Sequence, residues 1–279
     1  MASARSDRFQ RWLVSGPPSA FLVVFFLVPA LIMVIASFRY PGEFGGLAPF
    51  LPAAPGEEAG LTIENYRVFF EDRIYFEIFL KSFGVAALTT LLCLAIAYPL
   101  ALLIARSPKR HRNLMVLLCV LPFASNFLVR VYAWMIMLGP FDLLFSPFAV
   151  LAAMVYVHLP FMILPLYTNL EKHDPVLLDA AQDLGANGWA RFWRVTFPLS
   201  LPGVFAGSAL VFIPVLGMFA IPEILGGIGD WLVGNMIKES FLGVRDWPFG
   251  SMLSLMLTVC VLAIAGLAAW LARGSVARA

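Results

Sequence analysis

Long apolar stretches alternate with short charged segments along most of the chain. A helix needs about 20 residues to cross the ~30 Å of hydrocarbon in a bilayer, and most of the apolar runs reach that length. The runs between charged residues are Ala20–Phe38, Ser82–Ala105, Asn113–Val129, Leu143–Leu170, Val195–Pro222 and Trp247–Leu271. The third run is the shortest, but it continues beyond Arg130 to Leu138. The pattern therefore predicts six membrane-spanning helices.

The composition agrees with a bilayer protein. Hydrophobic residues make up 61% of the 279 residues and charged residues only 13%, and the mean hydropathy is +0.87, whereas soluble domains are about 45–50% apolar. No composition shift, low-complexity tract or repeat divides the sequence. We expect an all-α integral membrane fold with a single six-helix domain over 19–273, preceded by a short segment 1–18 and followed by a tail 274–279. The first run lacks a small-x-small cleavage site and is expected to be a retained anchor.

Lysine and arginine residues predict the orientation of these spans. If the six helices alternate in direction, twelve of the nineteen basic residues lie on one side: Arg5, Arg8, Arg11, Arg106, Lys109, Arg110, Arg112, Lys172, Arg191, Arg194, Arg273 and Arg278. Cytoplasmic loops carry the excess of Lys and Arg. Both termini and the polar loop 171–197 are therefore expected to be cytoplasmic, and segment 39–77 to be external.

The residue pattern of the loop 171–197 predicts two short helices joined by a turn. Four apolar residues fall at helical spacing in its first half: Leu177, Leu178, Ala181 and Leu184. The pattern breaks at Ala186-Asn187-Gly188 and resumes from Trp189 to Arg194. Gly185 ends the first helix and can adopt positive φ without a Cβ penalty. A compact amphipathic knob with a sharp reversal is expected.

Several residues of this loop form a recognisable motif. The spacing Asp-Ala-Ala-x3-Gly-x9-Val-x-Phe-Pro runs from Asp179 to Pro198. It resembles the cytoplasmic coupling loop of ATP-binding-cassette (ABC) importer permeases, whose consensus is Glu-Ala-Ala-x3-Gly-x9-Ile-x-Leu-Pro. The three departures, Asp179, Val195 and Phe197, keep charge sign or apolar character. The resemblance implies that an ATPase docks here through Asp179, Ala180, Ala181, Gly185, Phe192 and Pro198; the alternative is an ordinary polar loop between membrane helices.

Motifs elsewhere narrow the family. They are Leu121-Pro122-Phe123, the segment Leu128–Trp134, Ile163–Tyr167, Pro198–Gly203 and Phe219–Gly227. Together they resemble the spermidine/putrescine permease group, and the long segment Arg39–Glu77 is more like the first than the second of the two permeases in such systems. The resemblance implies a type I ABC importer (MetI-like) permease fold in a bacterial inner membrane. It also implies a heterodimer with a homologous second permease, an ATPase dimer and an extracytoplasmic polyamine-binding protein.

Catalytic and cofactor motifs are missing from the sequence. It has no Gly-x4-Gly-Lys-Ser/Thr phosphate loop, so ATP and Mg are expected to bind the partner ATPase. The histidines His111, His158 and His173 share no metal-ligand spacing, and no Ser, Cys or carboxylate forms a recognisable nucleophile or acid–base arrangement. The three cysteines lie inside apolar runs. We expect no enzyme activity, no metal, no cofactor in this chain, and no nucleic-acid partner.

A polyamine pathway should offer carboxylates and aromatic faces to a flexible multivalent cation. The candidate residues are Glu223, Trp134, Tyr132, Asp142, Asp230 and Phe219. Glu223 follows Pro222 at the predicted external end of the fifth span, where it could instead simply end the helix. Asp142 and Asp230 could equally hold loops or touch the binding protein. Arg130 would repel a cation and is expected to pair with a carboxylate or to snorkel outward.

Two other interpretations remain open. The chain could serve an importer of the same class for ferric ion, thiamine or a phosphonate, and an anionic substrate would suit Arg130 better. It could also be a membrane scaffold subunit that binds partners without transport.

Overall fold

The computed structural model describes residues 15–51 and 59–276, with side chains up to Gly266. Four basic residues used to predict the orientation, Arg5, Arg8, Arg11 and Arg278, lie outside the described residues, as do most of segment 1–18 and the end of the tail. The described chain is helical apart from loops, turns and two isolated β-bridges. It divides into two compact units, one formed by the described residues up to Arg73 together with those from Ile237 onward, the other by residues 74–236.

Five helices in the described part are long and apolar enough to cross a membrane. They are Ser15–Ser37, Arg73–Arg106, Pro147–Leu170, Gly188–Leu216 and Trp247–Gly266. A sixth candidate is a bent pair, Lys109–Ala124 with Phe127–Phe141, whose two halves meet at 91°. The count of six spans holds only if this bent pair counts as one.

The third run is therefore not the continuous helix that the apolar pattern suggested. Helix α5 (Lys109–Val120) tightens into the 3₁₀ turn η2 (Leu121–Ala124), and α6 (Phe127–Leu138) begins after a break. Asn126 has non-helical angles, and its side chain accepts a hydrogen bond from the backbone N–H of Leu128 at 2.8 Å. The break follows from local chemistry, because an N-cap starts a new helix and Pro122 lies in the turn before it.

The second and fifth spans also differ from their predicted limits. Helix α4 (Arg73–Arg106) begins well before Ser82. Helix α10 (Phe197–Leu216) ends before Pro222, and the short helix α11 (Ala220–Leu225) follows separately. Glu223 thus does not end the fifth span but lies in the first turn of α11. Gly217 and the residues after it leave the helix, which hydropathy alone does not reveal.

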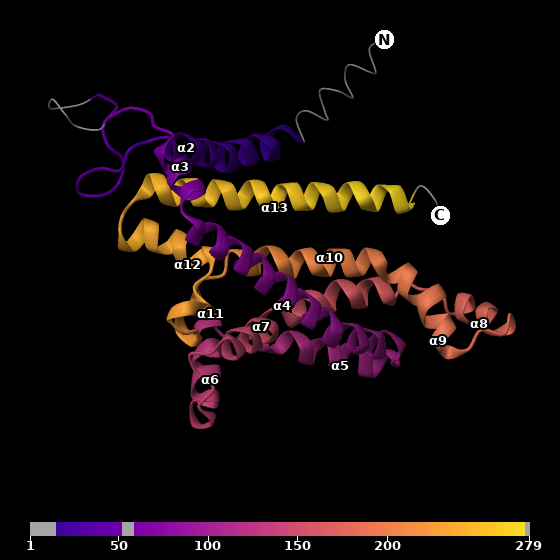
Figure 1. Cartoon of the computed structure of the whole chain (residues 1–279). Coiled ribbons are helices and arrows are strands. Elements are labelled where there is room, and N and C mark those ends of the chain that lie inside the picture. The colour runs from indigo at the N-terminus through magenta and orange to yellow at the C-terminus, as the bar shows by residue number, and fades with distance from the viewer. Residues whose placement is uncertain (1–14, 52–58, 277–279) are drawn as a thin grey trace, which may run out of the picture. The chain divides into compact units, whose positions relative to one another are not determined.

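The first unit is built on two helices that lie side by side (Figure 1). These are α2 (Val28–Ser37), which continues the π turn η1 (Val23–Leu27), and α13 (Trp247–Val276). Helix α3 (Glu64–Glu71) also packs on α13. The buried amide of Asn65 donates to the carbonyls of Ser37 and Arg39, both at 3.0 Å. These bonds tie the chain that leaves α2 to α3.

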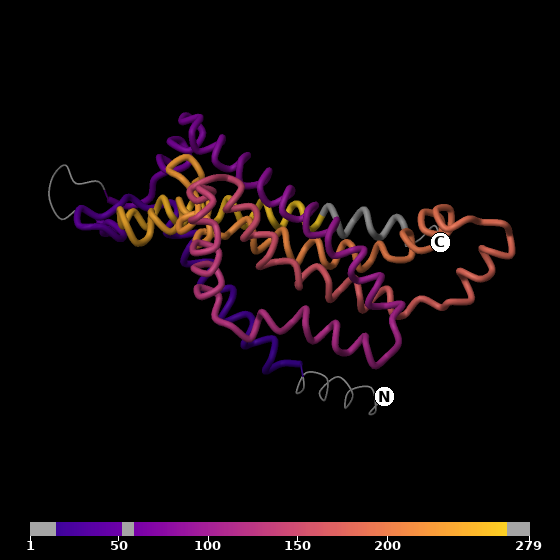
Figure 2. The backbone as a smooth tube through the Cα atoms, turned by 90° about the horizontal axis from the view of Figure 1, so that it is seen from below, coloured from indigo at the N-terminus to yellow at the C-terminus, as the bar shows by residue number. Residues whose placement is uncertain are grey.

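The second unit is organised by helix α7 (Pro147–Leu170) against α10. A Cβ atom at Gly203 would lie 2.8 Å from Cβ of Asn169, and one at Gly207 would lie 2.7 Å from the sulfur of Met162. The two glycines are four residues apart on one helix face. Small residues at this spacing let membrane helices approach closely. Figures 1 and 2 both place helices α8 (Pro175–Asp183) and α9 (Gly188–Arg191) beyond one end of this pair.

We expect Gly203→Ala to destabilise the protein by about 1–3 kcal/mol, because the added methyl group meets the fixed Cβ of Asn169 and the carbonyl of Pro165. Thermal unfolding of the detergent-purified chain measures the effect. The matched control is Gly84→Ala on α4, where nothing lies within 4 Å of the new atom and alanine favours the helix. Equal melting temperatures for the two variants would contradict the close approach of α7 and α10.

Candidate functional site

Helix α8 begins directly after α7 and starts with a strong cap. A carboxylate oxygen of Asp174 accepts a hydrogen bond from the backbone N–H of Val176 at 3.0 Å. Pro175 occupies the first turn, where its missing N–H costs nothing. The cap separates α8 from the span, so α8 and α9 form a knob over residues 174–191.

The predicted reversal at Gly185 is present. Gly185 has a φ of +82°, and its N–H donates to the carbonyl of Gln182 at 2.8 Å. The N–H of Ala186 donates to the carbonyl of Ala181 at 3.0 Å. This pair of bonds is a Schellman motif, which uses a left-handed residue to end a helix. The turn aims α9 back toward the membrane helices.

The two helices of the knob are also braced by side chains. Asn187 caps α9 by accepting from the N–H of Ala190 at 2.8 Å. The guanidinium of Arg191 donates to the side-chain oxygen of Gln182 at 2.7 Å. The brace joins α8 to α9 across the turn, so the knob can move as one piece. The sequence did not reveal it, because Gln182 and Arg191 belong to no motif.

The outer surface of the knob carries exposed apolar groups. Leu184 is 89% exposed and Trp189 is 73% exposed. Asp179 and Ala180 are exposed beside them, and Ala181 is half-buried. Small side chains allow close approach of another surface, and exposed apolar groups gathered at one place mark an interaction site. Asp179 and Ala180 of the motif thus lie exposed on the same knob as Leu184 and Trp189.

Two predicted coupling residues lie at the base of the knob. The ring of Phe192 is half-buried and meets Tyr98 at 5.6 Å and Trp193 at 5.2 Å, both edge-on. Phe192 begins the π turn η4 (Phe192–Thr196), which leads into α10. Pro198 is exposed in the first turn of α10. Phe192 therefore anchors the knob to α4 rather than lying on its outer surface.

An ion pair joins the start of the knob to the preceding loop. The guanidinium of Arg112 lies 2.6 Å from the carboxylate of Glu171 and also donates to the carbonyl of Ala105 at 2.9 Å. A hydrogen bond from Tyr167, together with Arg112, lowers the pKa of Glu171 below its usual value. Glu171 stays ionised and holds the end of α7 to the first turn of α5. Neither residue belonged to a predicted site.

At the other end of α10, a folded segment holds three of the six predicted pathway residues: Phe219, Glu223 and Asp230. It contains α11, the 3₁₀ turn η5 (Ile228–Asp230) and the start of α12 (Val233–Lys238). The side chain of Asn235 donates to the carbonyl of Phe219 at 3.0 Å, and the N–H of Val233 donates to the hydroxyl of Ser82 at 2.9 Å. These bonds fasten the segment to α4 and to its own first residues.

Asp230 takes part in this fastening. Its carboxylate accepts from the N–H of Gly227 at 3.0 Å, and the ammonium of Lys81 lies 3.5 Å from it. Lys81 also donates to the carbonyl of Gly229. Asp230 thus has donors from its own turn and from α4, an arrangement that fits the loop-holding alternative.

Glu223 lies on the short helix α11, and Phe219 is the residue that precedes it. Glu223 is exposed in the first turn of α11, and its N–H donates to the carbonyl of Phe219 at 3.1 Å. The ring of Phe219 is also exposed. Helix α11 packs against both α6 and α7. The structure therefore brings the helix of Glu223 next to the helix of Tyr132 and Trp134.

The aromatic candidates on α6 point in different directions. Trp134 is half-buried, and its ring meets that of Tyr156 on α7 edge-on at 5.7 Å. Tyr132 is half exposed. Asp142 follows the 3₁₀ turn η3 (Gly139–Phe141) in a left-handed conformation with φ of 56°, and it is exposed.

Arg130 corrects one expectation. Within residues 15–51 and 59–266, no carboxylate pairs with it; its guanidinium carbon lies 5.0 Å from the centre of the Phe123 ring. Its Nε atom is buried without a hydrogen-bond partner. An aromatic face stabilises a cation, so Phe123 holds Arg130 across the break between α5 and α6. Of the two alternatives expected for Arg130, pairing with a carboxylate is wrong, and snorkelling outward stays a prediction.

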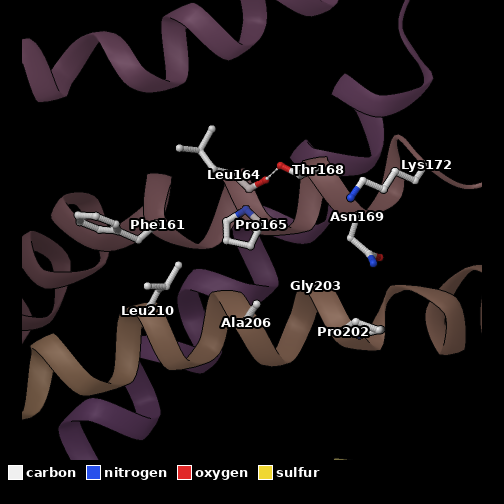
Figure 3. A pocket seen from close by; sticks show the side chains of 10 residues that line it. All are labelled: Phe161, Leu164, Pro165, Thr168, Asn169, Lys172, Pro202, Gly203, Ala206 and Leu210. Atoms are coloured by element: carbon white, nitrogen blue, oxygen red, sulfur yellow. Dashed lines mark hydrogen bonds between the residues drawn. The ribbon is translucent and has the colours of Figure 1, made fainter. Parts of the chain in front are cut away.

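A groove runs along the α7–α10 pair (Figure 3). Its volume is about 470 Å³. Its walls are mainly apolar, with the polar side chains of Thr168, Asn169 and Lys172 at one end. The amide oxygen of Asn169 is buried without a partner. None of the predicted pathway residues lines this groove, and Lys172 places a positive charge at its end.

The membrane-length helices define the class of protein: a multi-pass helical membrane protein, with an exposed helical knob at one end of the α7–α10 pair. A sequence model described as "Binding-protein-dependent transport system inner membrane component" matches residues 97–278, more than half of the chain. The chain belongs to this family of non-catalytic ABC permease components of the inner membrane. A permease of such a system works with an ATPase and a binding protein.

Curated relatives are similar over most of the chain. The spermidine/putrescine transport system permease protein PotB of Haemophilus influenzae is 39% identical over 273 residues, which cover 91% of each chain. PotB of Escherichia coli is 37% identical over 255 residues, covering 85% of this chain and 89% of PotB. The molybdenum transport permease ModB of Mycobacterium bovis is 33% identical over 193 residues, covering 64% of this chain and 73% of ModB.

A solved structure confirms the predicted fold. It is a bacterial ABC transporter involved in the import of the acidic polysaccharide alginate, and its matching chain aligns with a TM-score of 0.70. The alignment covers 97% of this chain and 98% of that chain, at 16% sequence identity. At this identity the likeness shows the fold alone. The chain has the fold of an ABC importer permease.

We expect Gly185→Ala to destabilise the knob by about 1–2 kcal/mol, because a side chain penalises the left-handed angles at this turn. Gly185→Asn should cost less, since asparagine tolerates that conformation. Proteolysis of the turn in the purified chain measures local opening. Gly188→Ala is the matched control, because Gly188 has ordinary helical angles and open space around it. Identical cleavage rates for Gly185→Ala and Gly188→Ala would rule out a conformational role for Gly185.

Proposed function

We propose that this chain is a permease subunit of an ATP-driven importer of polyamines, spermidine or putrescine. One observation carries the substrate class: the identity of 37–39% to PotB proteins over 85–91% of the chain. The more distant molybdenum permease matches at lower identity and over a smaller share of the chain. The polyamine hypothesis also agrees with the exposed carboxylate of Glu223 on α11 and the exposed ring of Phe219, the residue just before that helix.

The knob is proposed to be the seat of the ATPase. Its outer face combines exposed apolar side chains with the small residues Ala180 and Ala181. Its cap, turn and brace let it transmit a push or a pull without deforming. ATP and its Mg ion are proposed to bind the ATPase subunits, not this chain. Both termini and the knob are proposed to lie on the cytoplasmic side, as the excess of basic residues there supports.

The proposed assembly contains a second, homologous permease, two ATPase subunits and an extracytoplasmic polyamine-binding protein. Closure of the ATPases on ATP moves the knob, and the knob moves α7 and α10, which continue from its two ends. ATP and the loaded binding protein both favour the outward-facing state, so that substrate supply and hydrolysis are linked. Hydrolysis returns the helices to the inward-facing state.

The test of the substrate class is ATP hydrolysis by the complex reconstituted in lipid. The binding protein is offered with spermidine, putrescine, ferric ion, thiamine, a phosphonate or molybdate. Stimulation by a polyamine alone is the expected result. Stimulation by an oxyanion alone would overturn the polyamine assignment and keep the importer, and no stimulation by any ligand would overturn transport itself.

We expect Leu184→Ala to weaken binding of the ATPase about tenfold or more, because a fully exposed leucine at a docking face becomes buried in the complex. Co-purification of the ATPase and its titration in detergent measure the effect. Ile228→Ala is the matched control, since Ile228 is 100% exposed but lies on η5, remote from the knob in the chain. Equal losses in both variants would argue against the knob as the seat of the ATPase.

We expect Glu223→Gln to lower polyamine uptake about tenfold with the complex still assembled, because a charge-assisted hydrogen bond to an ammonium group contributes about 1.5–3 kcal/mol. Uptake of radiolabelled spermidine into proteoliposomes is the measurement. Glu43→Gln makes the same isosteric change at an exposed carboxylate of the other unit and should leave uptake unchanged. Full uptake by Glu223→Gln would remove Glu223 from the pathway.

A further inference from the structure

A partly open cavity lies behind the knob, on the side that faces the membrane helices. Its volume is about 430 Å³. Leu177 and Leu178 of α8 form one wall, and Leu102 near the end of α4 and Leu199 at the start of α10 contribute to the others. All the lining residues belong to the unit of residues 74–236. The cavity is distinct from the exposed outer face proposed for the ATPase.

Three hydrogen-bond donors around this cavity lack acceptors. The hydroxyl of Thr196 has no partner, although Thr196 is only 4% exposed. The Nε atom of Arg112 is also buried without a partner. Arg106 lines the same cavity, and within residues 15–51 and 59–266 it makes no hydrogen bond or ion pair. Buried polar groups are almost always satisfied in native proteins, so the buried donors of Thr196 and Arg112 call for an acceptor. Arg106 is exposed, and its guanidinium adds a third donor at the cavity.

The acceptors already present are engaged. The carboxylate of Glu171 is paired with Arg112, and that of Asp174 caps α8. The carbonyl oxygen of Leu199 lies 3.2 Å from the Nε2 atom of His173, so this acceptor is engaged as well. The space therefore offers unsatisfied hydrogen-bond donors, which suit a ligand rich in acceptor oxygens.

We propose that this cavity binds a phosphate group, carried either by the headgroup of an anionic membrane lipid or by a soluble phosphate compound. Thr196, Arg106 and the Nε of Arg112 donate to its oxygens, as hydroxyl and guanidinium groups do at phosphate sites. The leucines of the cavity wall accommodate the glycerol end of a lipid. Basic pockets between membrane helices are suited to anionic headgroups. The lipid source rests on the proposed cytoplasmic orientation, whereas the phosphate chemistry does not.

A bound phosphate would act on the inner side of the knob. It would link Arg106 at the end of α4, Arg112 in the first turn of α5 and Thr196 in the π turn that leads into α10. These segments line the same cavity as α8. The ligand would therefore stiffen the joint between the knob and the spans. This role is separate from docking of the ATPase and from the polyamine pathway.

The test uses the full-length chain and two probes. In the first arm, the protein is taken from nanodiscs that contain phosphatidylcholine with phosphatidylglycerol, and retained lipid is counted by native mass spectrometry. In the second arm, the lipid-depleted protein is melted in inorganic phosphate and in chloride at equal ionic strength. Neither arm depends on ATP, on a partner subunit or on uptake, so a failure of the polyamine assignment leaves the result intact.

The variants are Arg106→Gln and Thr196→Val, with Arg110→Gln as the matched control. Arg110 carries the same charge as Arg106 and lies in the first turn of α5, but it does not line the cavity. The first two changes should each weaken binding about tenfold, the effect of losing one hydrogen bond to a charged group, and the control should bind like the wild type. Arg112 is left unchanged because it holds Glu171. Melting in chloride alone checks that each variant is folded.

Each outcome has one meaning. Loss of phosphatidylglycerol in the cavity variants supports the proposal with a lipid source, and loss of stabilisation by inorganic phosphate supports it with a soluble source. Binding by neither probe to the wild type would overturn the proposal and leave a cavity filled by water. Equal binding by the cavity variants and Arg110→Gln would overturn it as well.

Discussion

The close approach of α7 and α10 is the constraint on which the rest of the second unit depends. Gly203 and Gly207 remove the side chains that would hold the two helices apart. In a bilayer, lipid tails compete equally for apolar surface, so helix association relies on close van der Waals packing. The knob continues from the end of α7 and leads back into α10. The separation of the two helices therefore determines where α8 and α9 can lie.

The two ends of this pair are built by different means. At one end, caps, a Schellman turn and the Gln182–Arg191 bond shape a knob whose polar backbone is satisfied internally. At the other end, α10 stops at Leu216 and the chain folds back through α11 and η5. There Asn235, Ser82 and Lys81 supply the hydrogen bonds that a continuous helix would have provided. Irregular backbone at membrane depth needs such partners.

The polar residues missed by sequence reasoning are those whose partners are remote in the chain. Arg112 and Glu171 meet across 59 positions, and Lys81 meets Asp230 across 149. No local sequence pattern predicts such pairs, because each residue by itself resembles a charged residue in an ordinary loop. For Arg130, the sequence indicated an important residue but not its partner. Its charge was noticed, but only the bend at Asn126 places it over Phe123.

The sequence by itself determined the membrane class, the approximate positions of the spans, the family and the turn at Gly185. These depend on composition, on run length and on residues close together in the chain, where local physics decides the outcome. Tertiary structure alone decided the end of the fifth span at Leu216, the inward packing of Phe192 and the cavity behind α8. Each of these arises from groups that helix packing brings together. The distances between packed helices depend on several segments at once, so no single segment of the sequence predicts them.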